Sequence, residues 1–203
     1  LNNKTNYIKT HNSMCTLGPY KFTTPKNTKG VIYLVRDPRD ILVSYANHLG
    51  LNHKQTFNIL SSPITFENIS TEFSEGKNYK NSIMGTWSDH FNSWKTFKFC
   101  NTLRVKYEDM ISDSSGTFLK ILKYLNEIDN IEINTQKLNK AVEQTQFKKL
   151  QDIEKKYGFS EKGKGNLFFR EGKIGVWKNN VDSEIIKKIE TIFKNEMSEL
   201  GYL

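Results

Sequence analysis

Arginine is scarce in this sequence, and its positions say more about chemistry than the many lysines do. Of 30 Lys and Arg residues, the arginines are Arg36, Arg39, Arg104 and Arg170. A guanidinium presents a rigid fork of N–H groups that matches the oxygens of a phosphate. Arg36 directly follows the apolar stretch Val31–Val35, where a strand would end. The formal net charge of +8 also favours an anionic partner. The alternative for the bulk charge is biased codon usage in a chain rich in Lys and Asn.

The residues around Arg36 predict the elements that position it. Val31–Val35 is apolar throughout, which is typical of a strand buried on both faces of a parallel sheet. Asp37 is a favourable N-cap and Pro38 a favourable first helical residue, so a helix is expected over about 38–50. Strand, turn and helix form an α/β unit. Its helix N-terminus lies at the carboxyl edge of the sheet, where such folds bind ligands.

The rest of the chain alternates between strand-like and helical patterns, which predicts an α/β fold with a parallel sheet. Further strands are expected at 6–10 and 103–107, and a long Gly- and Lys-rich surface loop at 158–180. Aromatic residues at helical spacing between 83 and 97 favour core packing over a base-stacking platform. Helical segments are expected within 53–75, 83–97, 118–125, 135–147 and 185–200.

Five segments together form a more specific pattern. They are Lys9-Thr-His11, Arg36-Asp-Pro-Arg-Asp-Ile-Leu-Val-Ser44, Tyr107-Glu-Asp-Met, Thr145-Gln-Phe147 and Arg170-Glu-Gly172-Lys-Ile-Gly-Val-Trp-Lys-Asn. In this order they resemble the motifs of sulfotransferases that use 3′-phosphoadenylyl sulfate (PAPS). The resemblance spans residues 8–203. It implies a single sulfotransferase-like domain over 1–203 with a P-loop-like fold, a three-layer sandwich whose central parallel sheet is flanked by helices.

The resemblance implies that PAPS binds as co-substrate and that four residues hold its 3′-phosphate. Arg36 pairs with the phosphate oxygens, and Ser44, two helical turns further on, donates its hydroxyl to the same group. Arg170 and the backbone of Gly172 close over it, since a glycine lets a backbone N–H approach an anion. The simpler alternatives are a surface ion pair for Arg36 and a solvated helix position for Ser44.

The same resemblance assigns three residues to the nucleoside. Tyr107 would contact the adenine side of the site, and Thr145 and Phe147 would line the adenine pocket, with Phe147 stacking on the base. The alternative for Tyr107 is a core tyrosine. For Phe147 it is ordinary helix packing.

The Lys-Thr-His segment is where the resemblance places the catalytic groups. His11 would be the general base, because an acceptor hydroxyl must lose its proton as it attacks sulfur and histidine titrates near neutral pH. Lys9 would offset the charge on the transferring sulfuryl oxygens. The alternative for His11 is a solvated loop residue. No set of His, Cys, Asp and Glu has metal-ligand spacing, so no metal is expected.

The sequence departs from the family pattern in two ways. The family begins with a strand and a Lys-Ser-Gly-Thr-Thr-Trp loop that holds the 5′-phosphosulfate, and this loop would precede Leu1, so we expect the chain alone to be a poor catalyst. Glu171 stands where the family usually has Lys, which should weaken binding of the 3′-phosphate. Gly158–Gly165 imitates a P-loop but lacks its Ser or Thr, and we reject it.

Several functions and partners stay open. The main alternative to an enzyme is a non-catalytic sulfotransferase-like protein that binds a nucleotide or polyanion. A nucleic-acid-binding protein and a P-loop kinase are weaker alternatives, and no motif indicates a specific nucleic acid partner. The acceptor is expected to be the hydroxyl of a small molecule, carbohydrate or lipid. With two cysteines, no membrane span and no visible anchor, a cytoplasmic protein is expected. The C-terminal helix offers a surface for a homodimer, without a decisive motif.

Overall fold

The computed structural model describes residues 5–63, 66–68 and 81–203. The chain divides into two compact units. The first unit contains Leu1–Val31 and Asn58–Thr102, and the second contains Ile32–Phe57 and Leu103–Leu203. Their positions relative to one another are not determined.

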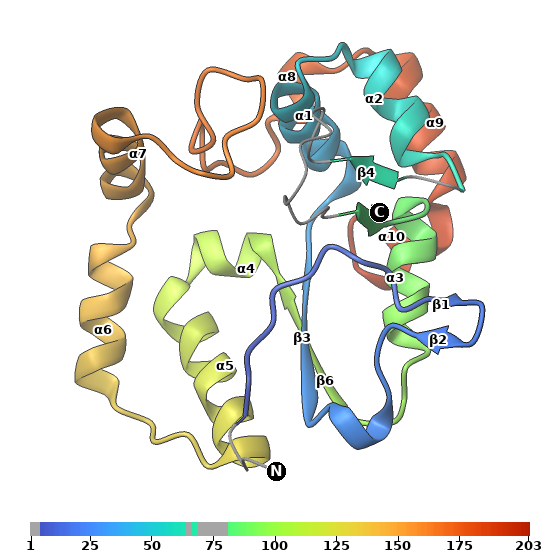
Figure 1. The fold of residues 1–203 in the computed structure, drawn as a ribbon. Helices are drawn as coiled ribbons and strands as arrows, with labels where there is room; N and C mark the ends of the chain where they lie inside the picture. Colours follow the sequence, from blue (N-terminus) through green and yellow to red (C-terminus); the bar gives the residue numbers. More distant parts are fainter. Residues whose placement is uncertain (1–4, 64–65, 69–80) are drawn as a thin grey trace, which may run out of the picture. The chain divides into compact units, whose positions relative to one another are not determined.

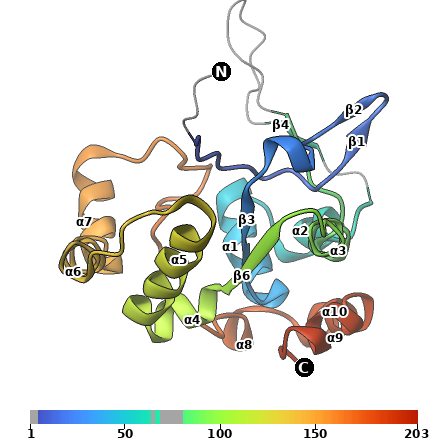
Figure 2. The ribbon, with the colours of Figure 1, turned by 90° about the horizontal axis from the view of Figure 1, so that it is seen from below.

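The longest strands of the described residues form a parallel pair, and the α/β class with a parallel sheet is confirmed. These strands are β3 (Gly30–Val35) and β6 (Asn101–Lys106), which lie side by side in Figures 1 and 2. Two short antiparallel pairs accompany them. Their strands are β1 (Thr16–Leu17) with β2 (Tyr20–Lys21) and β4 (Phe66–Asn68) with β5 (Asn81–Ile83).

The helix after β3 begins and ends as its local sequence predicts. α1 spans Pro38–Leu49, and the Asp37 carboxylate caps it by accepting a hydrogen bond from the N–H of Arg39 at 2.9 Å. Gly50 ends the helix in the left-handed conformation, with φ +66°. Leu42, with no exposed surface, lies on the buried face of the helix. Helix α1 is therefore capped at both of its ends.

The other helices are distributed over the two units. Thr86 and Asp89 form a capping box at the start of α3, whose rings at positions 87, 91 and 94 are buried, so the predicted core role of this aromatic stripe is confirmed. The helices are η1 (Pro25–Asn27), α2 (His53–Leu60), α3 (Trp87–Lys95), α4 (Tyr107–Ser112), α5 (Ser114–Asp129), α6 (Thr135–Gln144), α7 (Phe147–Tyr157), α8 (Trp177–Asn180), α9 (Ser183–Ile192) and α10 (Lys194–Glu199).

Three expectations about elements are wrong in detail. The segment 6–10 is not a strand, and all five of its residues are exposed. Ile83 belongs to β5 rather than to the helix that follows. The C-terminal helix is two helices, because the backbone of the fully buried Phe193 leaves the helical region at φ −103° and ψ 18°. Of the expected short helices within 53–75, α2 is present, and residues 69–75 lie outside the described residues.

Arg39 ties the start of α1 to the C-terminal end of the chain. Its guanidinium forms a bidentate pair with Asp37, at 3.0 Å from Nε to Oδ1 and 2.7 Å from Nη2 to Oδ2. It also donates to Glu190 Oε1 at 2.5 Å and to the carbonyl oxygen of Tyr202 at 2.8 Å. Burial alone would lower the pKa of Arg39, but these carboxylates raise it above its usual value. The charge of Arg39 is thus fully used inside the fold.

Replacing Arg39 with Ala should lower the free energy of unfolding by about 3 kcal/mol, because Asp37 is left buried without its cation. Arg104→Ala is the matched control, since Arg104 is 44% exposed and only 3.5 Å from Glu199, and it should cost less than about 1 kcal/mol. Urea unfolding of both variants measures the difference. Equal losses would show that the Arg39 network has no special weight.

Candidate anion-binding site

Arg36 lies where the sequence places it, at the carboxyl end of β3, and it faces Tyr107 at the start of α4. The guanidinium carbon is 4.1 Å from the centroid of the Tyr107 ring. Nη2 donates to the carbonyl oxygen of Lys173 at 3.1 Å and lies 3.9 Å from Asp40 Oδ2. Nε is buried and has no hydrogen-bond partner among the described residues. Arg36 therefore keeps a buried donor that still needs an acceptor.

Burial affects Tyr107 as well. It raises the pKa of the Tyr107 phenol, while the charge of Arg36 opposes the shift and Asp40 and Glu108 reinforce it. Tyr107 is therefore a neutral hydroxyl over the usual pH range, with its ring against a cation. The structure brings Arg36 and Tyr107 into contact.

The α7–α8 loop, residues 158–176, is held on α1 by the carboxylate of Asp40. Asp40 is 1% exposed. Its Oδ2 accepts a hydrogen bond from the N–H of Gly175 at 2.7 Å, and its Oδ1 accepts one from the N–H of Trp177 at 3.1 Å. The sequence analysis placed Asp40 in the helix but gave it no role. Its partners lie 135 and 137 residues further along the chain.

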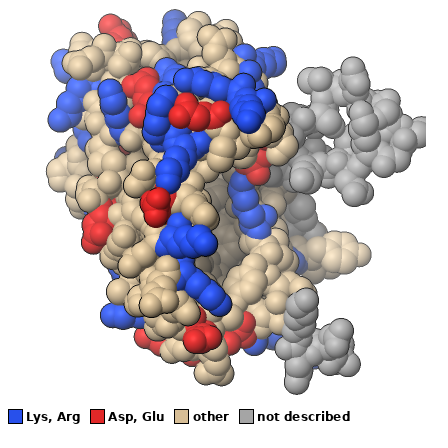
Figure 3. All heavy atoms as spheres, turned by 90° about the vertical axis from the view of Figure 1, so that its left-hand side faces the viewer, with Lys and Arg blue, Asp and Glu red and all other residues tan. Residues whose placement is uncertain are grey.

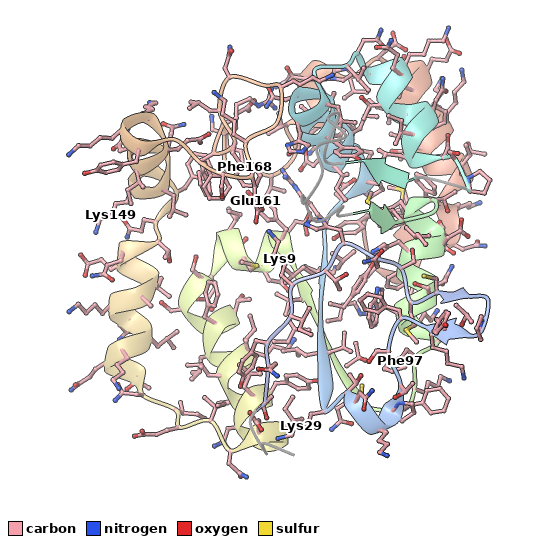
Figure 4. All side chains as sticks on the ribbon, in the orientation of Figure 1. Lys9, Lys29, Phe97, Lys149, Glu161 and Phe168 are labelled. Atoms are coloured by element: carbon pink, nitrogen blue, oxygen red, sulfur yellow. The ribbon has the colours of Figure 1, made fainter. Side chains whose placement is uncertain are left out.

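A second carboxylate holds the same loop from the side of α7. Glu154 is 4% exposed, and its two oxygens accept hydrogen bonds from the N–H groups of Phe168 at 2.6 Å and Phe169 at 2.8 Å. Nε2 of Gln151, one turn earlier, donates to the carbonyl oxygens of Phe169 and Arg170. Figure 1 shows the loop running from α7 to α8, and Figure 4 shows Phe168 between α7 and α1.

The glycines that imitate a P-loop serve packing. The N–H of Lys164 donates to the carbonyl oxygen of His48 at 2.8 Å. A Cβ at Gly163 would overlap that carbonyl, and a Cβ at Gly165 would lie 2.5 Å from Asn47 Nδ2. Glycine is needed here because the loop backbone touches the end of α1, which agrees with rejecting this segment as a phosphate loop.

Gly172 and Phe147 meet in the structure. Gly172 has φ +61°, and a Cβ on it would overlap the Phe147 ring. The Phe147 ring also contacts Phe169 edge-on, with centroids 6.3 Å apart. One side of Phe147 thus packs on the loop, so both the predicted adenine contact and the packing alternative remain compatible with its position.

The remaining expected contacts of the nucleotide are exposed. Ser44 lies on the exposed side of α1. Thr145 is exposed at the end of α6, and its hydroxyl donates to the carbonyl oxygen of Ala141 at 2.8 Å. Arg170 Nη2 is paired with Glu171 Oε1 at 3.0 Å. Two of these three side chains are therefore engaged by neighbours in the second unit.

The Lys-Thr-His segment belongs to the first unit, where α3 fixes the residues that follow it. Lys9 and His11 have exposed side chains. His90 Nε2 lies 3.3 Å from the carbonyl oxygen of His11, and Trp94 Nε1 donates to the carbonyl oxygen of Asn12 at 2.9 Å. The sequence analysis found no role for His90. The periodic spacing of α3 gave only its packing face, and not these polar contacts.

Much of the positive charge is spread over a mixed surface. Figure 3 looks onto the side of the second unit that carries α6 and α7, where Lys and Arg alternate with Asp and Glu. Lys148 pairs with Asp152 at 3.0 Å, and Lys149 with Glu143 at 3.2 Å. Such exposed pairs are ordinary solvated surface. This face therefore gives little support to a nucleic acid partner.

Metal-binding clusters and membrane-spanning helices are both absent from the described residues. No three His, Cys, Asp or Glu side chains within 5–63, 66–68 and 81–203 are grouped as a metal ion requires. In the same part of the chain, no helix combines the length and the apolar character of a membrane span.

The fold and the Arg36 site define a class of protein that comparison with known families makes specific. Residues 1–201 match the family model described as the sulfotransferase domain. The chain belongs to this family. It spans about three fifths of the length of the curated relatives it matches.

The relatives include enzymes named for different acceptors. The chain is 27% identical to an amine sulfotransferase of Oryctolagus cuniculus, over 89% of the chain and 60% of the relative. It is 26% identical to sulfotransferase 1C2 of Homo sapiens, over 94% and 61%. It is also 26% identical to a 3-alpha-hydroxysteroid sulfotransferase of Cavia porcellus, over 85% and 56%.

Solved structures show the same P-loop-like α/β fold. Mouse sulfotransferase SULT7A1 complexed with PAP aligns with a TM-score of 0.57 and 22% identity, over 83% of this chain and 58% of that one. Retinol dehydratase in complex with androsterone and the inactive cofactor PAP aligns with a TM-score of 0.56 and 23% identity, over 82% and 46%.

Gly172→Ala should destabilise the chain by more than Gly158→Ala. Both glycines have positive φ, but a Cβ at Gly158 meets nothing within 4 Å, whereas one at Gly172 overlaps Phe147. Gly158→Ala should cost about 1 kcal/mol of backbone strain, and Gly172→Ala about 2 kcal/mol or more. Thermal unfolding measures both. A double-mutant cycle with Phe147→Ala should show that the extra loss depends on the ring.

Folding stability should fall in mild acid because of His90. Burial lowers the pKa of His90, although its contact with the His11 carbonyl opposes the shift. The unfolded chain therefore binds a proton below about pH 6.5 that the folded chain refuses, so stability is present above this pH and is lost as the pH falls.

His90→Gln keeps an N–H for the His11 carbonyl but removes the titration. Between pH 6.5 and 5 it should flatten the fall in unfolding free energy by up to about 1.4 kcal/mol per pH unit. Urea titrations at several pH values test this, with Lys54→Gln, which changes an exposed side chain, as the control. An unchanged slope would contradict the role of His90.

Proposed function

We propose that this protein is a sulfotransferase that moves a sulfuryl group from PAPS to the hydroxyl of a small-molecule, carbohydrate or lipid acceptor. The observation that carries the proposal is the family match over residues 1–201 together with Arg36, whose buried Nε lacks an acceptor at the end of β3. A phosphate oxygen would satisfy this donor. The PAP-bound complexes of similarly folded proteins support the same ligand class.

In this proposal Arg36 binds the 3′-phosphate, with Ser44, Arg170 and the N–H of Gly172 as further donors. The contact between Arg36 and the Lys173 carbonyl supports the grouping, because it joins the strand end to the loop that carries Arg170 and Gly172. Tyr107, packed on Arg36, lies at the edge of the same group.

Two more residues complete the nucleotide contacts. Thr145 and Phe147, at the junction of α6 and α7, would line the adenine pocket. The contact of Phe147 with Gly172 supports this arrangement, because it links the adenine side to the phosphate loop.

The proposed chemistry is direct in-line transfer. The acceptor oxygen attacks the sulfur of PAPS, an O–S bond forms, and the bond from sulfur to the phosphate oxygen breaks. Adenosine 3′,5′-bisphosphate (PAP) leaves with the electron pair, and the acceptor proton goes to the His11 imidazole. Lys9 offsets the negative charge on the sulfuryl oxygens in the transition state. The exposure of both side chains supports access to an acceptor.

The acceptor class remains wide within this proposal. The amine and hydroxysteroid sulfotransferases among the relatives are named for an amine and a hydroxyl acceptor. We propose a hydroxyl acceptor and a cytoplasmic location.

A second candidate, a non-catalytic nucleotide-binding relative, is favoured by one contact. Glu171 pairs with Arg170 at 3.0 Å and places a negative charge beside a residue that should bind phosphate. A protein that binds nucleotide without catalysis tolerates such a weakening better than an enzyme does.

PAP should bind more tightly than ADP, which has two phosphates but no 3′-phosphate. Isothermal titration should give a dissociation constant at least about tenfold lower for PAP than for ADP. The reason is that Arg36 forms charge-assisted hydrogen bonds with the 3′-phosphate, which only PAP carries. Arg36→Ala should remove the preference, and Arg104→Ala should keep it. Equal affinities in the unchanged protein would overturn the proposal.

His11→Ala should separate the enzyme from the non-catalytic relative. Sulfuryl transfer from PAPS to a panel of a phenol, a sterol and an amine should fall about 10²–10⁴-fold, with the affinity for PAP unchanged. His53→Ala, at the first residue of α2, is the control and should leave the rate unchanged. The panel is run on the chain supplied with the family's Lys-Ser-Gly-Thr-Thr-Trp loop, and PAP binding without transfer there would favour the non-catalytic candidate.

A further inference from the structure

We infer that Glu154 is a positioning residue for the loop that receives the 3′-phosphate, an inference that rests on the proposed function. Glu154 belongs to α7, which carries none of the phosphate-binding residues. Its carboxylate is buried, and both of its oxygens accept backbone N–H groups of the α7–α8 loop. It acts through the loop backbone and touches no proposed reacting atom.

Burying the Glu154 carboxylate has a cost in free energy. A carboxylate removed from water is destabilising unless hydrogen bonds replace its hydration. The N–H groups of Phe168 and Phe169 supply two charge-assisted bonds at 2.6 and 2.8 Å. Moving this part of the loop would strand the charge, so the two amides are held firmly.

These two amides lie just before Arg170 in the chain. Phe169 directly precedes Arg170, and Gln151 on the same helix binds the carbonyl oxygens of both residues. Helix α7 therefore fixes the backbone around Arg170 at two points, the N–H of the preceding Phe169 and the carbonyl oxygen of Arg170 itself. This sets the starting point of the Arg170 side chain.

The opposite end of the loop is held by the buried carboxylate of Asp40. Asp40 accepts hydrogen bonds from the N–H groups of Gly175 and Trp177. Residues 170–174 therefore lie between two anchored segments, one bonded to Glu154 and the other to Asp40. Arg36 joins this span through the carbonyl of Lys173. With both ends tied, five residues have few ways to place the N–H of Gly172. Loss of the Glu154 anchor frees one end.

The test compares PAP with ADP in Glu154→Gln. The amide keeps the shape of the side chain but turns an N–H₂ donor toward a backbone donor. The PAP dissociation constant should rise about tenfold while that of ADP stays within about twofold. Asp152→Asn is the matched control on the same helix, because Asp152 is 56% exposed and bonded only to Lys148 among the contacts found for it. It should change neither constant.

Hydrogen exchange gives a second readout. In Glu154→Gln the amides of Phe168 and Phe169 should lose protection, whereas those of Gly175 and Trp177, bonded to Asp40, should keep it. If this variant does not fold, Glu154→Asp keeps the charge but is one methylene shorter, and the same selective loss is expected.

The outcomes separate the two proposals. No preference for PAP over ADP in the unchanged protein overturns the proposed function, and this inference with it. A preference that is undiminished in the folded Glu154 variant, or an equal loss of PAP and ADP binding, overturns the inference alone and leaves the proposed function standing.

Discussion

Buried negative charge is the constraint on which the second unit depends. Asp40 and Glu154 are almost wholly removed from water, and each is satisfied chiefly by backbone N–H groups of the α7–α8 loop. The loop has no helix or strand of its own between 158 and 176. Its position therefore comes from these carboxylates, from glycines that let it approach α1, and from the ring of Phe147. A long loop becomes a defined surface because two charges cannot be left unsatisfied.

Two arginines three residues apart show how the same turn separates stability from binding. Arg39 donates hydrogen bonds to Asp37, Glu190 and the Tyr202 carbonyl oxygen, so its charge stabilises the fold. Arg36 makes a weaker set of contacts and retains a buried Nε without a partner among the described residues. Because Arg39 neutralises the acidic residues around it, Arg36 is the arginine of this turn that we propose for phosphate binding.

Features encoded in neighbouring residues could be predicted from the sequence. Asp37 and Pro38 gave the start of α1, its expected end lay within one residue of Leu49, and the β3–α1 turn placed Arg36. Helix α7 was missed, although Phe147, Leu150 and Tyr157 recur at helical spacing and could have revealed it. The segment 6–10 has strand-like residues but no sheet partner, so composition alone misled.

The anchors of the site could not be predicted, because they join residues far apart in sequence. A Glu among the lysines of α7 looks like an exposed surface residue, and only the fold brings Phe168 to it. The contact of His90 with the His11 carbonyl likewise spans 79 residues. A local pattern gives the identity of a side chain and the element that carries it. The overall topology of the chain decides which distant backbone amide comes to lie against that side chain.

The departure at Glu171 matters less than its charge suggests. Glu171 and Arg170 are both more than a third exposed, and an exposed ion pair contributes about 0–1 kcal/mol. A phosphate with up to two negative charges offers Arg170 more acceptors than one carboxylate does, so exchanging partners costs little. What the substitution removes is the extra cation of the family pattern. Arg36, with a side chain only 20% exposed, is less screened by water, and it should therefore contribute more to phosphate affinity in this protein than Arg170.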